Sequence, residues 1–281
     1  MPLPRSMTAQ EQRTYLDWFP VLDVTLAVVT GEIDSHYNCI AWTINCTSNP
    51  VWLTPATVDA YDTFYGQLGY TNVTIGEIAL LGTSEVEVVH GMVSGPAHGP
   101  RWESKNGTDL RFQHGLHELD YSCYGHIVAQ YHKTGSPHER FARHLERIMH
   151  QIHPATYLTP EQHAVLTTLI QGVPQQVRDD YKTAFTSWKA SWFRGSLRIL
   201  SNPALRRVGP EFDALIALGP KILPLVLASL ADPENYFALQ LYDCIQPRPD
   251  LIVTFKPDDE RVLEGEPGRA RRTLDAWFRN G

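Results

Sequence analysis

Cysteine is scarce in this sequence, and its few copies form no recognisable pair. The 281 residues contain four cysteines without a Cys-x-x-Cys motif or a closely spaced framework, namely Cys39, Cys46, Cys123 and Cys244. This pattern argues against a disulfide scaffold and is typical of free thiols in a reducing compartment. We therefore expect a cytoplasmic protein.

Long apolar segments and a basic surplus are missing as well. No window approaches the ~18 apolar residues that a transmembrane helix needs. The first six residues also lack the apolar run of a secretory signal. A net charge of −7 argues against a nucleic-acid binder, which would normally carry a basic surplus. We expect neither a membrane nor a nucleic-acid partner.

The overall composition is typical of a globular protein, and the sequence divides into two regions. Apolar residues make up 43% of the sequence and charged residues 20%, which is enough for an ordinary core. Residues 1–135 predict an α+β domain with a helix after Thr54-Pro55 and a small antiparallel sheet. The expected strands are Val21–Val29, Glu77–Leu81, Glu85–Val93, Pro100–Lys105, Asp109–His114 and Tyr124–His132.

Residues 136–281 change character and predict an all-α domain. Four cap-then-proline pairs are typical of helix starts, at Ser136-Pro137, Thr159-Pro160, Asn202-Pro203 and Asp232-Pro233. The short helices between them suggest a helical array such as HEAT-like hairpins, although no fixed-period repeat is found. Such an array could present a substrate or a protein partner.

Cys39 is the best candidate for a reactive group. It follows Asn38 at the start of a short apolar run, and a thiol at a helix N-terminus is favoured as the thiolate. His90 ends the strand pattern Glu85–His90, where Val86, Val88 and His90 share a parity. A histidine within hydrogen-bond reach of a cysteine can take its proton and return it to the leaving group.

These motifs resemble a known class of cysteine hydrolases. The segment Asn38–Trp42 resembles the nucleophile segment of NlpC/P60-type, papain-like cysteine peptidases, and His90 is similar to their strand histidine. The stretch from about 36 to 132 also resembles a poorly characterised family with an Asn-Cys-x-Ala-Trp start, a histidine strand, a Trp-x-Ser-Lys-x-Gly segment and a Tyr-Gly strand. Here the last two are Trp102–Gly107 and Tyr124-Gly125.

The resemblance implies a Cys39–His90 dyad and a third residue that orients the imidazole. Strand alternation places Trp102 and Ser104 on one face and Glu103 on the other. Ser104 and Glu103 are equal candidates for the third position, with His114 behind them, and Trp102 is a possible further member of the site. Asn38 is expected to cap the helix or to donate to an oxyanion.

Plainer interpretations apply to several of these residues. Free cysteine is among the most buried residue types, so Cys39 taken alone is more typical of a core. His114, His117 and Glu118 do not match either common zinc motif, and no third ligand can be named. We expect no metal and no other cofactor. The segment 95–100 is either a gating loop or an ordinary one.

The sequence therefore predicts a papain-like cysteine hydrolase or acyltransferase that acts on an amide, isopeptide or thioester bond. Its substrate would be a small molecule or a peptide. The alternative is a non-catalytic interaction module that keeps a papain-like fold beside a helical region.

Overall fold

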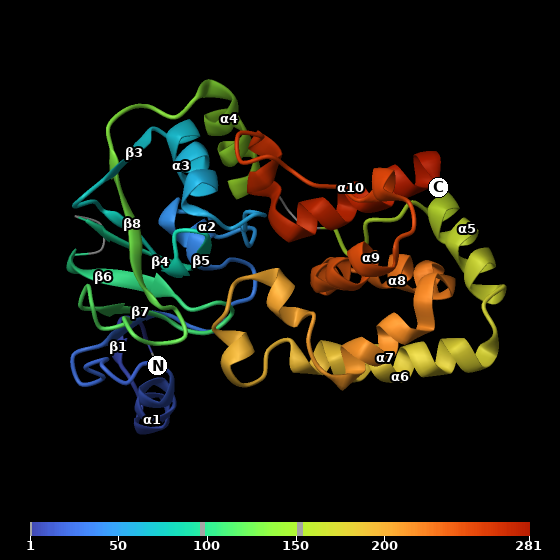
Figure 1. Ribbon diagram of the computed structural model, residues 1–281, viewed down its shortest axis with the longest axis horizontal. Coiled ribbons are helices and arrows are strands. Elements are labelled where there is room, and N and C mark those ends of the chain that lie inside the picture. Colours follow the sequence, from blue (N-terminus) through green and yellow to red (C-terminus); the bar gives the residue numbers. More distant parts are fainter. Residues whose placement is uncertain (1, 96–98, 151–153) are drawn as a thin grey trace. The chain divides into compact units, whose positions relative to one another are not determined.

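The chain forms two compact units, which are described separately (Figure 1). The computed structural model describes residues 2–95, 99–150 and 154–281. The sheet unit comprises residues 1–151, 198–202 and 255–263, and the helical unit comprises 152–197, 203–254 and 264–281. The chain thus leaves and re-enters the sheet unit, in contrast to the single boundary expected at residue 135.

An eight-stranded antiparallel sheet organises the sheet unit, with the order β1-β2-β7-β6-β5-β4-β8-β3. The strands are β1 (Arg5–Ser6), β2 (Val28–Gly31), β3 (Tyr70–Val73), β4 (Ile78–Ser84), β5 (Glu87–Gly95), β6 (Gly99–Lys105), β7 (Arg111–His114) and β8 (His126–Lys133). The central strands agree with the sequence prediction. The expected strand at 21–29 is shorter, because residues 21–27 form turns and an irregular segment.

The two faces of this sheet carry separate hydrophobic clusters. Helices α2 (Cys39–Thr43) and α3 (Val58–Gln67) pack on one face with Ile78, Leu80 and Val88, and residues of α4 (Glu139–Met149) join the same cluster. The opposite face carries Ala79, Leu81, Met92 and Phe112, together with residues of α1 (Ala9–Trp18) and Ile199. We call these the α2 face and the α1 face.

Two of the expected helix starts in the sheet unit lie a few residues away from the observed ones. Helix α3 begins at Val58 with Thr57 as its N-cap, not at Thr54-Pro55. Helix α4 begins at Glu139 with His138 as its N-cap, after the expected pair Ser136-Pro137.

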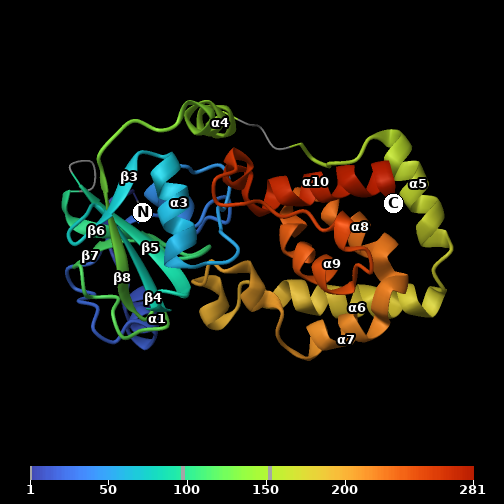
Figure 2. The same ribbon diagram turned by 45° about the horizontal axis from the view of Figure 1, so that its top comes forward.

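The helical unit consists of α-helices and 3₁₀ turns (Figure 2). Buried aromatic residues lie in its hydrophobic cluster. Its α-helices are α5 (Pro160–Gln171), α6 (Gln175–Ser191), α7 (Pro210–Leu218), α8 (Leu223–Leu230), α9 (Leu239–Ile245) and α10 (Gly265–Asn280). Trp188 and Trp192 are fully buried at its centre, with ring centroids 4.9 Å apart. Thr159 and Gln162 form the predicted capping box of α5. Asn202-Pro203 and Asp232-Pro233 instead precede 3₁₀ turns, at Pro203–Arg206 and Pro233–Ala238.

One stretch of the helical unit departs from the expectation about apolar segments. Pro210–Leu230 is long and apolar enough to cross a membrane by length and composition. Several of its apolar residues, including Phe212, Leu215 and Val226, pack inside the aromatic core. A single helix of this kind is weak evidence for a membrane span, because a core helix has the same composition.

The observed class is α+β with a helical region after the sheet, as the sequence predicts. The α-helical content of the second region and the antiparallel sheet of the first are both present. The order of helices and strands does not identify a HEAT-like or a papain-like fold, so both of these stay predictions.

Candidate functional site

Helix α2 is held in place by its N-cap, Asn38. The Asn38 side-chain oxygen accepts hydrogen bonds from the amides of Ala41 (3.0 Å) and Val51 (3.1 Å), and its amide nitrogen donates to the Val51 carbonyl (2.7 Å). The predicted cap role is therefore observed, and the residue also fastens the helix to the segment at Val51. A β-carbon on Gly91 of β5 would lie 3.0 Å from Ile40, so glycine there lets α2 approach the strand closely.

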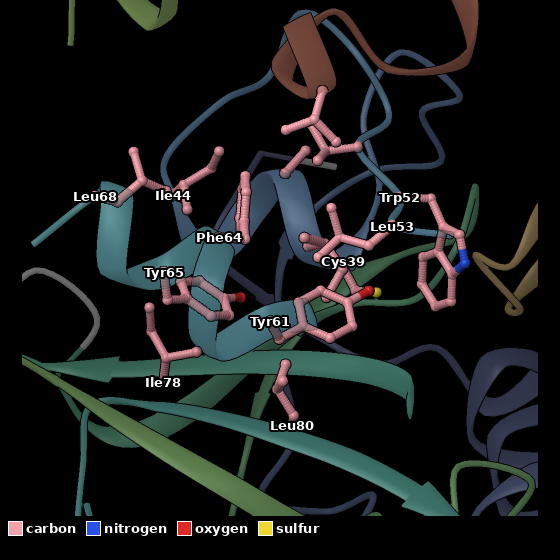
Figure 3. Packing of buried hydrophobic residues seen from close by; sticks show 14 of the residues in the cluster. Cys39, Ile44, Trp52, Leu53, Tyr61, Phe64, Tyr65, Leu68, Ile78 and Leu80 are labelled. Atoms are coloured by element: carbon pink, nitrogen blue, oxygen red, sulfur yellow. The ribbon is translucent and has the colours of Figure 1, made fainter. Parts of the chain in front are cut away.

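Cys39 is the first residue of α2, and its side chain is fully buried among aromatic residues (Figure 3). Its thiol donates a hydrogen bond to Ser201 Oγ at 3.2 Å. Burial raises the pKa of the thiol, because the anion would lose its hydration. The Ser201 hydroxyl, which can donate to the thiolate, the backbone amides of Gly91 and Ile40, and the charge on Lys105 all act in the opposite direction on this pKa.

His90 lies on β5, directly before Gly91, and is also fully buried. Its ring stacks on Tyr124, with centroids 3.9 Å apart and an interplanar angle of 5°. Neither ring nitrogen has a hydrogen-bond partner among the described residues. Burial, followed by the proximity of His114, lowers the pKa of His90 well below its ordinary value. The imidazole is therefore neutral at pH 7.

Cys39 and His90 are associated with opposite faces of the sheet. Gly91 faces Ile40 of α2, so strand alternation turns His90 toward the α1 face, where Met92 and Tyr124 lie. The expectation that Val88 and His90 share one face is wrong. In the pairing of β5 with β4, His90 lies opposite Leu81 and Val88 lies opposite Gly82, so the register shifts between these two pairs. This bulge separates the faces of Val88 and His90. The structure describes no Cys39–His90 hydrogen bond.

Ser104 and His114 are brought together on the α1 face of the sheet. Ser104 lies opposite Phe112 and Trp102 lies opposite His114 in the β6–β7 register. The distance from Ser104 Oγ to His114 Nε2 is 2.8 Å, and that from His114 Nδ1 to the Gly115 carbonyl is 2.7 Å. A carbonyl only accepts, so Nδ1 carries the proton and Nε2 accepts from Ser104. Ser104 thus bonds His114, and His90 receives no bond from either residue.

Glu103 belongs to a different cluster. Its carboxylate lies 3.2 Å from Arg111 Nε and accepts a short hydrogen bond from Thr30 Oγ. The Arg111 guanidinium also lies 3.9 Å above the Trp42 ring. In this arrangement Glu103 holds an arginine against α2, and no contact between Glu103 and His90 is described.

Three residues near the site could not be assigned from the sequence. Ser201 is 162 positions away from Cys39, and no local motif marks it. Tyr124 was visible only as part of the Tyr-Gly pair, and Lys105 only as part of the Trp-x-Ser-Lys segment. Lys105 is fully buried, and its ammonium donates to the carbonyls of Asp34, Gly107 and Asp109 at 2.9, 2.8 and 2.7 Å. Burial lowers the pKa of Lys105 to about 8.

The His-x-x-His-Glu pattern does not form a ligand set. His114 is buried against Ser104, whereas His117 is 70% exposed and pairs with Asp120 at 2.8 Å. Within the described ranges, no group of three or more His, Cys, Asp or Glu side chains is placed to hold a metal ion. The proposed gating loop contains residues 96–98, which lie outside the described residues.

Comparison with known proteins gives one match. A family model described as a domain of unknown function (DUF7689) matches residues 28–132, which include Cys39, His90, Ser104 and His114. No curated protein and no solved structure matches the chain significantly.

Proposed function

We propose that the sheet unit is a papain-like (NlpC/P60-like) domain that carries out acyl transfer through the thiol of Cys39. The bond attacked would be an amide, isopeptide or thioester in a peptide or a small molecule. A thiol nucleophile must stay reduced, so the proposal includes a cytoplasmic setting, and all four cysteines are free.

The surroundings of the Cys39 sulfur carry this proposal. Burial raises the pKa of the thiol, and four nearby groups lower it. These are the hydroxyl of Ser201, the amides of Gly91 and Ile40, and the charge on Lys105. Backbone amides lower the pKa of the buried Cys46 thiol as well, so the groups that distinguish Cys39 are the Ser201 hydroxyl and the charge on Lys105. Admission of water would relieve the desolvation, and the polar groups would then favour the thiolate.

In the proposed reaction, Cys39 Sγ attacks the carbonyl carbon of the substrate. The thiol proton passes to His90 and then to the departing amine or thiolate, which leaves a thioester on Cys39. Water would cleave this thioester to an acid and restore the thiol, whereas an amine acceptor would form a new amide. His90 is neutral and its ring nitrogens have no described hydrogen-bond partner, so a lone pair is available. Burial lowers the pKa of His90, so the imidazole becomes an effective base only when opening admits water.

The reaction requires the described conformation to open. Cys39 is fully buried, its thiol donates to Ser201, and the imidazole of His90 is directed to the α1 face. Both groups are therefore neutral and separated at rest. Opening must admit the substrate to Cys39 and bring the imidazole within reach of the thiol.

This separation favours a second candidate, a non-catalytic interaction module. The protonated, inaccessible thiol would then be a core residue, and the helical unit would provide the surface for a protein partner. The two candidates differ in whether Cys39 accepts an acyl group.

An acyl-adduct experiment tests the proposed function. The full chain would be incubated with p-nitrophenyl acetate, and the adduct located by peptide mass spectrometry. We expect acetylation of Cys39 and its absence in Cys39→Ser. Cys46 is the matched control, because it is equally buried and its pKa is also raised by burial. Equal labelling of Cys39 and Cys46 would exclude the enzyme.

A further inference from the structure

We propose that residues Arg198–Asn202 form a strap that covers Cys39 and keeps the site closed. This proposal rests on the proposed function, in which an accessible thiol is the active state. The strap belongs to the sheet unit, although the chain on both sides of it belongs to the helical unit.

The strap contacts the Cys39 thiol directly and is linked to His90 through Tyr124. Ser201 accepts the hydrogen bond of the Cys39 thiol, and it is itself buried. Two residues earlier, the Ile199 carbonyl accepts from the hydroxyl of Tyr124 at 2.8 Å, and the ring of Tyr124 stacks on His90. A single five-residue segment therefore occupies the surroundings of the thiol and of the imidazole.

Side chains of the strap anchor it to the sheet unit. Ile199 is fully buried in the hydrophobic cluster of the α1 face. Arg198 forms an ion pair with the buried carboxylate of Asp109, and its guanidinium lies 5.7 Å from the Trp18 ring centroid. Ile199 and Arg198 therefore both fasten the strap to the sheet unit.

The backbone of the strap is anchored by the loop that follows β6. The Arg198 carbonyl accepts from the Thr108 amide at 2.8 Å and from the Thr108 hydroxyl at 3.1 Å. A β-carbon on Gly107, whose φ is +53°, would lie 2.4 Å from this carbonyl oxygen. Glycine is thus required there for the strap to come this close. The Trp-x-Ser-Lys-x-Gly segment therefore ends in a seat for the strap.

His90 supplies the second observation that points to a site beneath the strap. An unpartnered, fully buried imidazole is costly, because its nitrogens lose their hydrogen bonds to water. The Tyr124 ring covers it, and the strap holds the Tyr124 hydroxyl. Release of the strap would uncover the Cys39 thiol and would leave the Tyr124 hydroxyl with Asn106 Oδ1 (3.1 Å) as its remaining acceptor, which loosens the ring that covers His90.

The chain connection suggests how the strap is released. Its two ends continue directly into the 3₁₀ turns Gly195–Arg198 and Pro203–Arg206. Any change that displaces these turns acts on both ends of the strap.

Alkylation kinetics test the strap. In the full chain carrying Cys123→Ser and Cys244→Ser, which remove the two exposed thiols, iodoacetamide labelling of Cys39 and Cys46 would be followed by mass spectrometry. Ile199→Ala removes the buried anchor. We expect it to raise the ratio of the Cys39 rate to the Cys46 rate by at least about tenfold, since local opening becomes easier than global unfolding.

Ile148→Ala is the matched control, because Ile148 is equally buried in the sheet unit but outside the strap. It should leave the ratio unchanged. Thr108→Val, which removes the hydroxyl and its bond to Arg198, is a milder second variant should Ile199→Ala not fold. If the ratio of the Cys39 rate to the Cys46 rate is unchanged in the strap variants, the strap does not cover Cys39. If the ratio rises but Cys39 forms no acyl adduct, the strap stands and the proposed function fails.

Discussion

His90 and His114 are two buried histidines of the same sheet face with different surroundings. Both ring nitrogens of His114 are hydrogen-bonded, to Ser104 and to the Gly115 carbonyl. Those of His90 have no described partner. A bonded imidazole contributes to stability, whereas an unbonded one costs free energy that a purely structural residue would not need. This contrast makes His90 the better candidate for a functional role.

Replacement of His90 by phenylalanine should therefore not weaken the fold. His90→Phe removes two unpaired nitrogens and retains the stack on Tyr124, so we expect the free energy of unfolding to stay the same or to rise by about 1 kcal/mol. His114→Phe is the matched control and should lower it by about 1–3 kcal/mol, because the Ser104 hydroxyl loses its acceptor. Urea titration measures both values. A large loss of stability in His90→Phe would indicate that the imidazole has a structural role.

The same two histidines predict a pH dependence of stability. Burial lowers the pKa of His114 from 6.5 to about 4, and the pKa of His90 is lowered as well. The unfolded chain therefore binds more protons between pH 6.5 and 4, so stability is lost as the pH falls through this window. His114 alone corresponds to about 3 kcal/mol at most.

Urea titrations at pH 7.5 and pH 5 would measure this loss, with carboxylates contributing below pH 5 in every variant. His90→Phe should show a smaller difference between the two pH values than the unsubstituted chain. Equal differences would mean that His90 is not buried as a neutral group.

At the scale of single elements, helix α2 and strand β5 were predictable, but their relation was not. Capping residues and apolar periodicity act locally, and Asn38 does cap α2. The bulge at Val88 and His90 depends on pairing with β4, and one residue of shift turns a side chain to the other face. The face of His90 therefore could not be inferred from strand alternation alone.

Asn38 gives a test of how firmly α2 is held. Asn38→Ala should lower the free energy of unfolding by about 2–4 kcal/mol, because it removes a cap and leaves the buried Val51 amide and carbonyl unpaired. Thr57→Ala, which removes one cap bond to Ala60 from α3, should cost about 1 kcal/mol. Denaturant unfolding compares the two. Equal losses would show that the Val51 bonds contribute nothing.

At the scale of the whole molecule, the sequence predicted the fold class but not the path of the chain. Composition and helix signals separate a sheet-forming region from a helical one, and this separation is observed. The return of residues 198–202 and 255–263 to the sheet unit depends on contacts between positions far apart in the sequence. Local patterns carry no information about such contacts, which is also why Ser201 was missed.

Because residues 198–202 and 255–263 belong to the sheet unit, we predict that residues 1–135 do not fold by themselves. A fragment of residues 1–135 would lack Ile199, Val262 and Leu263, which are all buried in the clusters of the sheet unit. Their loss opens the core, so we expect no cooperative unfolding transition for the fragment in a urea titration monitored by circular dichroism. A transition with the midpoint and slope of the full chain would show that the sheet unit needs only its first 135 residues.

The pH dependence of Cys39 alkylation tests most directly whether Cys39 is a nucleophile. In the chain that lacks the two exposed thiols, the rate at Cys39 should level off at a pH below the ordinary thiol pKa of about 8.5. Opening admits water and removes the Ser201 hydroxyl, but it leaves the amides of Gly91 and Ile40 and the charge on Lys105, which favour the thiolate. His90→Phe should move this midpoint upward, while the midpoint of Cys46, which burial raises, should be the same in both proteins. A Cys39 midpoint at or above 8.5 that is unchanged in His90→Phe would contradict the assignment of Cys39 as a nucleophile.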